Sequence, residues 1–288
     1  DWEKTLSVTK DLYNRARRPN IMIAIPGTTQ MLITVEEAIF AGIPVNVTLL
    51  FSREQYVATA EAYLRGIERR IASGLKPDVA SVASFFVNRR YSLTSGKVPE
   101  ECCRKLGTAM AKQTYKSFRK LLSTPRFEHI HNAGARPQRL VWTGAEPWDS
   151  KNHLHYTRSL VAPLTITVLP GTRLNALAGH EDTDTCMAED ATDCETVLYL
   201  FAQAGVDIDA PAAQAQQEGV NSLVETWIEL LTVIASKSAT LIQIHNEKIN
   251  KTKEKVYESK TNFIRSDSIS HCGGPCCGNA GKCLCRRK

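Results

Sequence analysis

Short runs of β-branched and aromatic residues alternate with longer amphipathic stretches through most of the chain. Turn-forming residues bound each short run, which is typical of buried strands. Parallel strands need a crossover connection that is usually a helix, so this alternation predicts an α/β fold with a parallel sheet. The predicted strands cover residues 21–25, 45–51, 82–87, 139–143 and 164–168.

The longer stretches carry apolar residues at helical spacing. In residues 54–73 the apolar stripe consists of Tyr56, Ala60, Tyr63, Leu64 and Ile67. We expect such helices to cover the outer face of the sheet. The predicted helices cover residues 34–40, 54–73, 100–122 and 220–237.

The second predicted strand alternates in polarity although it should be buried on both faces. Val45 and Val47 face one side, whereas Asn46 and Thr48 face the other. The interior of a closed sheet is normally packed with branched aliphatic residues, so inward polar residues near strand ends indicate a polar pocket at the carboxyl-terminal mouth. A hydrogen-bonded pair satisfied within the core is the alternative, and it stays open.

Charge is distributed unevenly along the chain. The formal charge is +6, with 36 Lys and Arg against 30 Asp and Glu. Residues 247–288 contain 10 of these basic and 4 of these acidic residues, which leaves 26 of each in residues 1–246. The body is therefore neutral, and we expect it to present no nucleic-acid-binding face.

Hydropathy and cysteine usage bear on the compartment. No window approaches the ~18 uninterrupted apolar residues of a membrane span, and the first residues show no secretory pattern. The cysteines of the body are scattered rather than grouped in a framework, as in reduced proteins. We therefore expect a cytoplasmic protein that does not associate with membranes.

The regular pattern ends near Asn246, and a Lys-rich stretch then leads into a Cys- and Gly-rich cluster. We expect a body at residues 1–240 and a disordered basic tail at residues 246–288. Five thiols within the tail are weak candidates for a soft-metal site, but their spacing matches no familiar zinc motif. An unstructured extension is favoured over metal binding, and a small disulfide-knotted peptide is a third reading. The candidate ligands are Cys272, Cys276, Cys277, Cys283 and Cys285.

Five segments resemble consecutive strands of one enzyme family. Residues 18–28 (RPNIMIAIPGT) and 42–52 (GIPVNVTLLFS) look like the fourth and fifth strands of transaldolases. The segments SVASFFVNR, NAGARPQRLVW and APLTITVLP, which begin at residues 81, 132 and 162, are similar to the sixth, seventh and eighth strands. Residues 1–240 thus resemble a transaldolase, of the type sometimes fused to glucose-6-phosphate isomerase, truncated at its amino terminus.

The resemblance implies a (β/α)8 barrel fold, present here as a partial barrel of about five parallel strands. It also implies dihydroxyacetone transfer between sugar phosphates in the pentose phosphate pathway, without a cofactor, through a Schiff base on a lysine of the fourth strand. Ala24 occupies that lysine position. Asn46, Thr48 and Ser84 match positions that line the family's substrate site, and Arg89 matches the arginine that holds the substrate phosphate.

Two departures from the family bear on activity. Alanine carries no nucleophile at position 24. Residues 1–13 resemble the helix after the third strand, so the first three strands and their acid–base carboxylates are expected to be absent. A transaldolase of lost or impaired activity is one hypothesis. The other is a non-catalytic protein that binds a sugar phosphate, or a partner through open barrel edges, or a truncated gene product.

Overall fold

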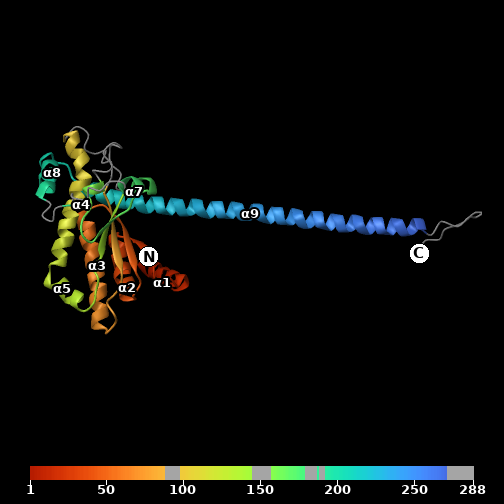
Figure 1. Cartoon of the computed structure of the whole chain (residues 1–288), viewed down its shortest axis with the longest axis horizontal. Helices are drawn as coiled ribbons and strands as arrows, with labels where there is room; N and C mark the ends of the chain where they lie inside the picture. Colours follow the sequence, from red (N-terminus) through yellow and green to blue (C-terminus); the bar gives the residue numbers. More distant parts are fainter. Residues whose placement is uncertain (88–97, 145–156, 179–186, 188–191, 271–288) are drawn as a thin grey trace, which may run out of the picture. The chain divides into compact units, whose positions relative to one another are not determined.

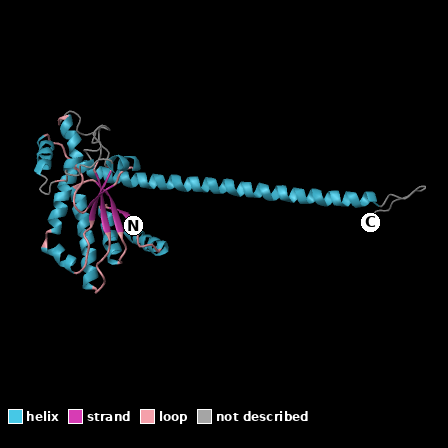
Figure 2. Ribbon diagram, in the orientation of Figure 1, coloured by secondary structure: helices cyan, strands magenta, loops and turns pink. Residues whose placement is uncertain are grey.

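The computed structural model describes residues 1–87, 98–144, 157–178, 187 and 192–270. Five parallel strands form one sheet in the order β1-β2-β3-β4-β5. Figure 2 shows the strands gathered together among the helices. The α/β fold with a five-stranded parallel sheet is therefore confirmed. The strands are β1 (Ile23–Pro26), β2 (Val45–Leu50), β3 (Ser81–Phe86), β4 (Arg139–Thr143) and β5 (Thr165–Thr167).

Helices connect β1 to β2, β2 to β3 and β3 to β4, and they lie beside the sheet (Figure 1). Each predicted helix is present with similar bounds, except the last, which is much longer than expected. The helical segments are α1 (Trp2–Ala16), η1 (Thr29–Met31), α2 (Leu32–Phe40), α3 (Arg53–Ala72), α4 (Glu100–Leu122), α5 (Pro125–Asn132), α7 (Gly171–Ala178), α8 (Thr192–Gln203) and α9 (Asp209–Ser270).

Helix α9 continues beyond Asn246, where the apolar pattern was expected to give way to disorder. Residues 220–270 contain no Pro or Gly, and their Lys, Glu and Gln residues are good helix formers even without a packed face. The chain divides into compact units at Asp1–Leu223 and Val224–Lys288, so the division falls inside this helix rather than near residue 240.

The main core lies between the sheet and its helices. Val45 and Val47 are fully buried in the same apolar cluster as Ile39 of α2 and Tyr63 and Ile67 of α3. Burying an aliphatic side chain of this size stabilises the fold by about 1.5–3 kcal/mol. The apolar residues of β2 therefore face the helices, as predicted from their alternation with polar residues.

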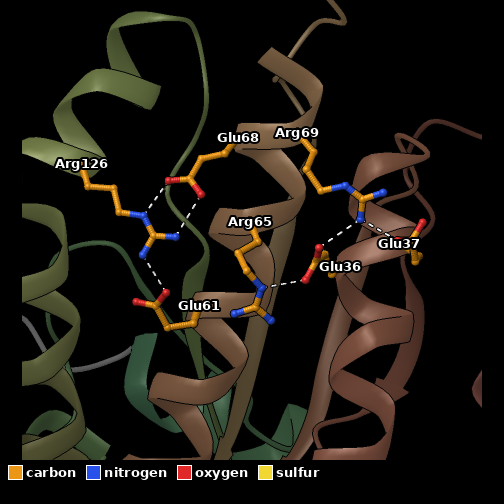
Figure 3. Close-up of polar contacts among 7 residues, drawn as sticks. All are labelled: Glu36, Glu37, Glu61, Arg65, Glu68, Arg69 and Arg126. Atoms are coloured by element: carbon orange, nitrogen blue, oxygen red, sulfur yellow. Dashed lines mark hydrogen bonds and ion pairs between the residues drawn. The ribbon is translucent and has the colours of Figure 1, made fainter. Parts of the chain in front are cut away.

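Arginine–glutamate pairs join helices α2, α3 and α5 on their exposed sides (Figure 3). Arg126 donates to Glu68 at 2.6 Å and 3.0 Å and to Glu61 at 2.6 Å, and these hydrogen bonds raise its pKa. Arg69 bridges both acidic residues of α2, because its Nη1 lies 3.0 Å from Glu36 and 2.5 Å from Glu37. The pairs align three helices that lie in sequence between β1 and β4.

Candidate functional site

The polar residues of the strands meet on the inner side of the sheet, opposite the helices. Ala24 of β1 pairs in register with Asn46 of β2, and Pro26 pairs with Thr48. Asn46 and Thr48 are half-buried and Ala24 is exposed, whereas the valines beside them are fully buried. The predicted inward orientation of Asn46 and Thr48 is confirmed, and Ala24, the position expected for the family's lysine, faces the same side.

Ser84 joins this group from the neighbouring strand. Its Oγ donates a hydrogen bond to Oδ1 of Asn46 at 2.7 Å, and the side chain is only 6% exposed. The side-chain oxygen of Asn46 thus has a hydrogen-bond partner within the sheet, as in the alternative of a hydrogen-bonded pair in the core. Asn46 nevertheless remains partly accessible to solvent. Three of the four substrate-binding positions suggested by the resemblance therefore lie on adjoining strands. Arg89, the fourth, is outside the described residues.

The end of β2 is distorted directly beside these residues. Pairing between β2 and β3 changes register between Val47 and Leu50, and Leu49 has a φ of 61°. A left-handed conformation is costly for a leucine, so surrounding contacts must hold it. Gln216 of α9 provides one, because its Nε2 donates to the carbonyl of Leu49 at 2.9 Å and to that of Gly27 at 3.0 Å.

The first turns of α9 cover this strand end. Leu49 and Phe51 form a small buried cluster with Ala212 and Ala215. A Cβ on Gly219 would lie 2.8 Å from Cδ2 of Leu49, so glycine permits the close approach of helix and strand. The helix therefore closes the C-terminal end of β2.

A second glutamine, on α3, links the residues after β2 to α9. Gln55 accepts hydrogen bonds from the backbone N–H groups of Phe51 and Ser52 at 2.7 Å and 3.2 Å, and donates to the carbonyl of Ala212 at 3.3 Å. The Ser52-x-x-Gln55 spacing is a capping-box pattern, so the sequence could have revealed this residue. No sequence pattern marks Gln216, whose partners are far away along the chain.

The described strands offer almost no ionisable chemistry. Their only charged side chain is Arg139, at the first position of β4 and therefore at the opposite end from the mouth. No lysine, aspartate or glutamate occurs within β1–β5. The inner face can thus donate and accept hydrogen bonds, but these strands hold no group that could form a Schiff base or act as a general base.

A metal site is not supported in the part of the chain that the structure describes. Within it, no group of three or more His, Cys, Asp or Glu residues is placed to hold an ion. The five tail cysteines considered as weak ligands, Cys272, Cys276, Cys277, Cys283 and Cys285, lie outside the described residues.

Comparison with known proteins agrees with the strand motifs and the sheet. A family model described as Transaldolase/Fructose-6-phosphate aldolase matches residues 1–234. The chain belongs to this family. The transaldolase of Parafrankia sp. (strain EAN1pec) is 36% identical over 245 residues, and that of Saccharopolyspora erythraea is 34% identical over 242. Each alignment covers 81% of this chain and 66% of the relative.

The chain therefore spans just under two thirds of the length of these transaldolases. The transaldolase of Trichodesmium erythraeum is 32% identical over 263 residues, covering 85% of this chain and 69% of the relative. The family match ends at residue 234, so more than half of α9 lies outside it.

Proposed function

We propose that this family member binds a sugar phosphate of the pentose phosphate pathway without forming a covalent intermediate, and that its dihydroxyacetone transfer activity is lost or strongly impaired. Membership of the transaldolase family supports the substrate class. The cytoplasm, where such substrates are found, is the compartment we propose.

One observation carries this proposal. Ala24 occupies the expected lysine position and faces the inner side of the sheet beside Asn46, and no lysine occurs in the described strands to replace it. The Schiff-base route that the family implies requires an amine there, because the iminium it forms is the electron sink for carbon–carbon cleavage. Removing a covalent nucleophile costs on the order of 10⁶-fold in kcat in a serine protease, which retained binding groups did not restore.

The neighbouring polar groups remain suited to binding. Because Oδ1 of Asn46 accepts the bond from Ser84, the amide N–H groups of Asn46 would face a ligand. Thr48 adds a hydroxyl on the same strand. Arg89 would hold the phosphate, a role that rests on the resemblance and on the fit of guanidinium to phosphate.

The test combines borohydride trapping with a designed lysine. We expect the wild-type chain, incubated with fructose 6-phosphate and borohydride, to show neither turnover nor a covalent adduct by mass spectrometry. Ala24→Lys should form a trapped dihydroxyacetone adduct at position 24, because the side chain would extend from the exposed inner position of β1.

Met22→Lys is the matched control. Met22 lies two residues earlier and is 39% exposed, so its amine would lie one step farther from the mouth and should not be trapped. A wild-type adduct on any lysine would contradict the proposal. Calorimetric titration of the wild type with fructose 6-phosphate separates the alternatives, because absence of binding would favour a protein-interaction role over sugar-phosphate binding.

A further inference from the structure

Helix α9 carries a long exposed apolar stripe from Val224 to Val256. Its residues recur at spacings of three, four and seven, so they share one side of the helix. Trp227 is 59% exposed, Leu241 is 66% exposed and Ile242 is 60% exposed. The stripe consists of Val224, Trp227, Ile228, Leu230, Leu231, Ile234, Leu241, Ile242, Ile249 and Val256.

The acidic residues of the same helix gather on one side. Glu225 and Glu229 are one turn apart, and Glu247 follows Glu229 by five full turns, so these acids share the side opposite the stripe. Glu254 falls on that side one heptad later. The acidic residues thus lie as far from the apolar stripe as the helix allows.

Lysines instead border the stripe. Lys248 lies one heptad after Leu241, and Lys255 one heptad after Lys248, which places both along one margin together with Lys237. Lys253, four residues after Ile249, lies on the other margin, and these four lysines are exposed. The fifth lysine of the segment, Lys251, is also exposed but lies toward the acidic side. Their aliphatic stems can lie along apolar surface while the ammonium groups reach outward.

We propose that residues 224–257 form an amphipathic helix that binds in the plane of an anionic lipid surface. The apolar stripe would enter the boundary between headgroups and acyl chains, and the bordering lysines would meet anionic headgroups. The acidic side would face water. Trp227 and Tyr257, the latter 76% exposed, are suited to the membrane–water boundary.

A second copy of the helix fits this surface less well. Residues at the margins of an apolar stripe face one another when two helices pair. Here the margins carry lysines from Lys237 onward and the acids lie on the far side, so a parallel pair would bring like charges together. Charge complementarity therefore favours an anionic lipid surface over self-pairing.

The helix also fits a surface better than a membrane span. A stretch of α9 reaches a mean hydropathy of 1.2, enough by length and composition to cross a membrane, and none of it is buried. Glu229 and Lys237 interrupt the apolar region, and Glu247 and Lys248 follow it. Central charges are costly in hydrocarbon, whereas an interfacial helix keeps them in water. The expectation of no membrane association relied on uninterrupted apolar runs, which do not detect such a helix.

The test measures partition of the full chain onto vesicles by flotation. We expect binding to phosphatidylcholine mixed with phosphatidylserine, and binding at least about 25-fold weaker to phosphatidylcholine alone or in high salt. The variant Leu241→Glu with Ile242→Glu should bind the mixed vesicles at least about tenfold more weakly. Lys248→Gln with Lys255→Gln should lose affinity for the mixed vesicles only, because each lysine near an anionic surface contributes about fivefold.

The matched control is Thr240→Glu with Gln243→Glu. It adds the same two charges to the same turns on the acidic side, so binding should change less than about threefold. Circular dichroism checks that each variant keeps its helix content. Absence of vesicle binding, or equal losses in the stripe and control variants, would overturn the proposal, as would a stripe-dependent dimer in sedimentation without lipid binding. Resistance to alkaline extraction would indicate a spanning helix instead.

Discussion

A single glutamine side chain links three segments that are distant in the sequence. Gln216 of α9 donates to backbone carbonyls that follow β1 and end β2, at Gly27 and Leu49. Leu49 has a left-handed backbone conformation that an ordinary strand would not adopt. The glutamine therefore stabilises the irregular strand end next to the candidate binding residues.

We predict that Gln216→Ala lowers the free energy of unfolding by about 1–2 kcal/mol, because two partly buried carbonyls lose their hydrogen-bond donor. Gln217→Ala is the control, since that exposed side chain bonds only to the side chain of Asn221 among the contacts described for it. It should cost less than about 0.5 kcal/mol. Urea denaturation measures both values, and equal losses would show that the hydrogen bonds of Gln216 contribute nothing specific.

Among the elements, α2 and α3 are joined by both apolar packing and ion pairs. Glu36 of α2 lies 2.7 Å from Nε of Arg65 and 3.0 Å from Nη1 of Arg69. Partial burial raises the pKa of Glu36, but the hydrogen bonds from the two arginines outweigh it and leave the pKa below its usual value. Ionised Glu36 is thus favoured by the folded state.

The pH dependence follows from that sign. A carboxyl whose pKa is lowered by folding contributes stability above its unfolded-state pKa, and this contribution is lost as pH falls through the folded-state value. We predict that Glu36→Gln lowers the free energy of unfolding by about 1 kcal/mol at neutral pH. Below about pH 4.5, the variant should lose less stability on further acidification than the wild type does.

The measurement is the free energy of unfolding from urea titrations between acidic and neutral pH. Glu100→Gln serves as the control, because the contact of Glu100 with Arg104 is exposed and lies within a single helix. It should change stability by less than about 0.5 kcal/mol. If the free energy of unfolding falls equally with acidification in the wild type and in Glu36→Gln, the interhelical ion pairs are not the source of the acid sensitivity.

For the whole molecule, the edges of the sheet are the features that bear on association. Within the described residues β1 pairs with β2 alone and β5 with β4 alone. Exposed apolar side chains lie near both edges, including Met22 at 39% and Val168 at 54% exposure. Strand edges of this kind pair readily with other chains. Association through them is therefore our proposal for this protein.

We predict a concentration-dependent increase in sedimentation coefficient that Val168→Lys reduces, because an exposed charge beside an edge strand opposes pairing. Leu75→Lys is the control, since Leu75 is 44% exposed in the turn after α3 and away from the sheet edges. Equal effects of the two lysines, or a monomer at every concentration, would contradict association through β5.

Sequence-based expectation and structure differ most where contacts are distant along the chain. Alternation of Val45, Asn46, Val47 and Thr48 predicted which side chains face inward, because side-chain direction in a strand follows from position alone. The bond between Ser84 and Asn46 depends on the register between two strands, which the alternation leaves undetermined. Gln216 depends on where α9 crosses the strand ends, and nothing nearby in the sequence encodes that crossing.

The sequence by itself determined the order of the strands, the position of the longer helices, the family, and the expectation that Ala24 stands in the place of the family's lysine, because these follow from local pattern and from residue identity. Only the tertiary structure decided that the end of β2 is distorted and held by the first turns of α9. The physical reason is that local propensity and periodicity act over a few residues. Strand register and the close approach of helix and strand at Gly219 arise only when the chain is placed in space.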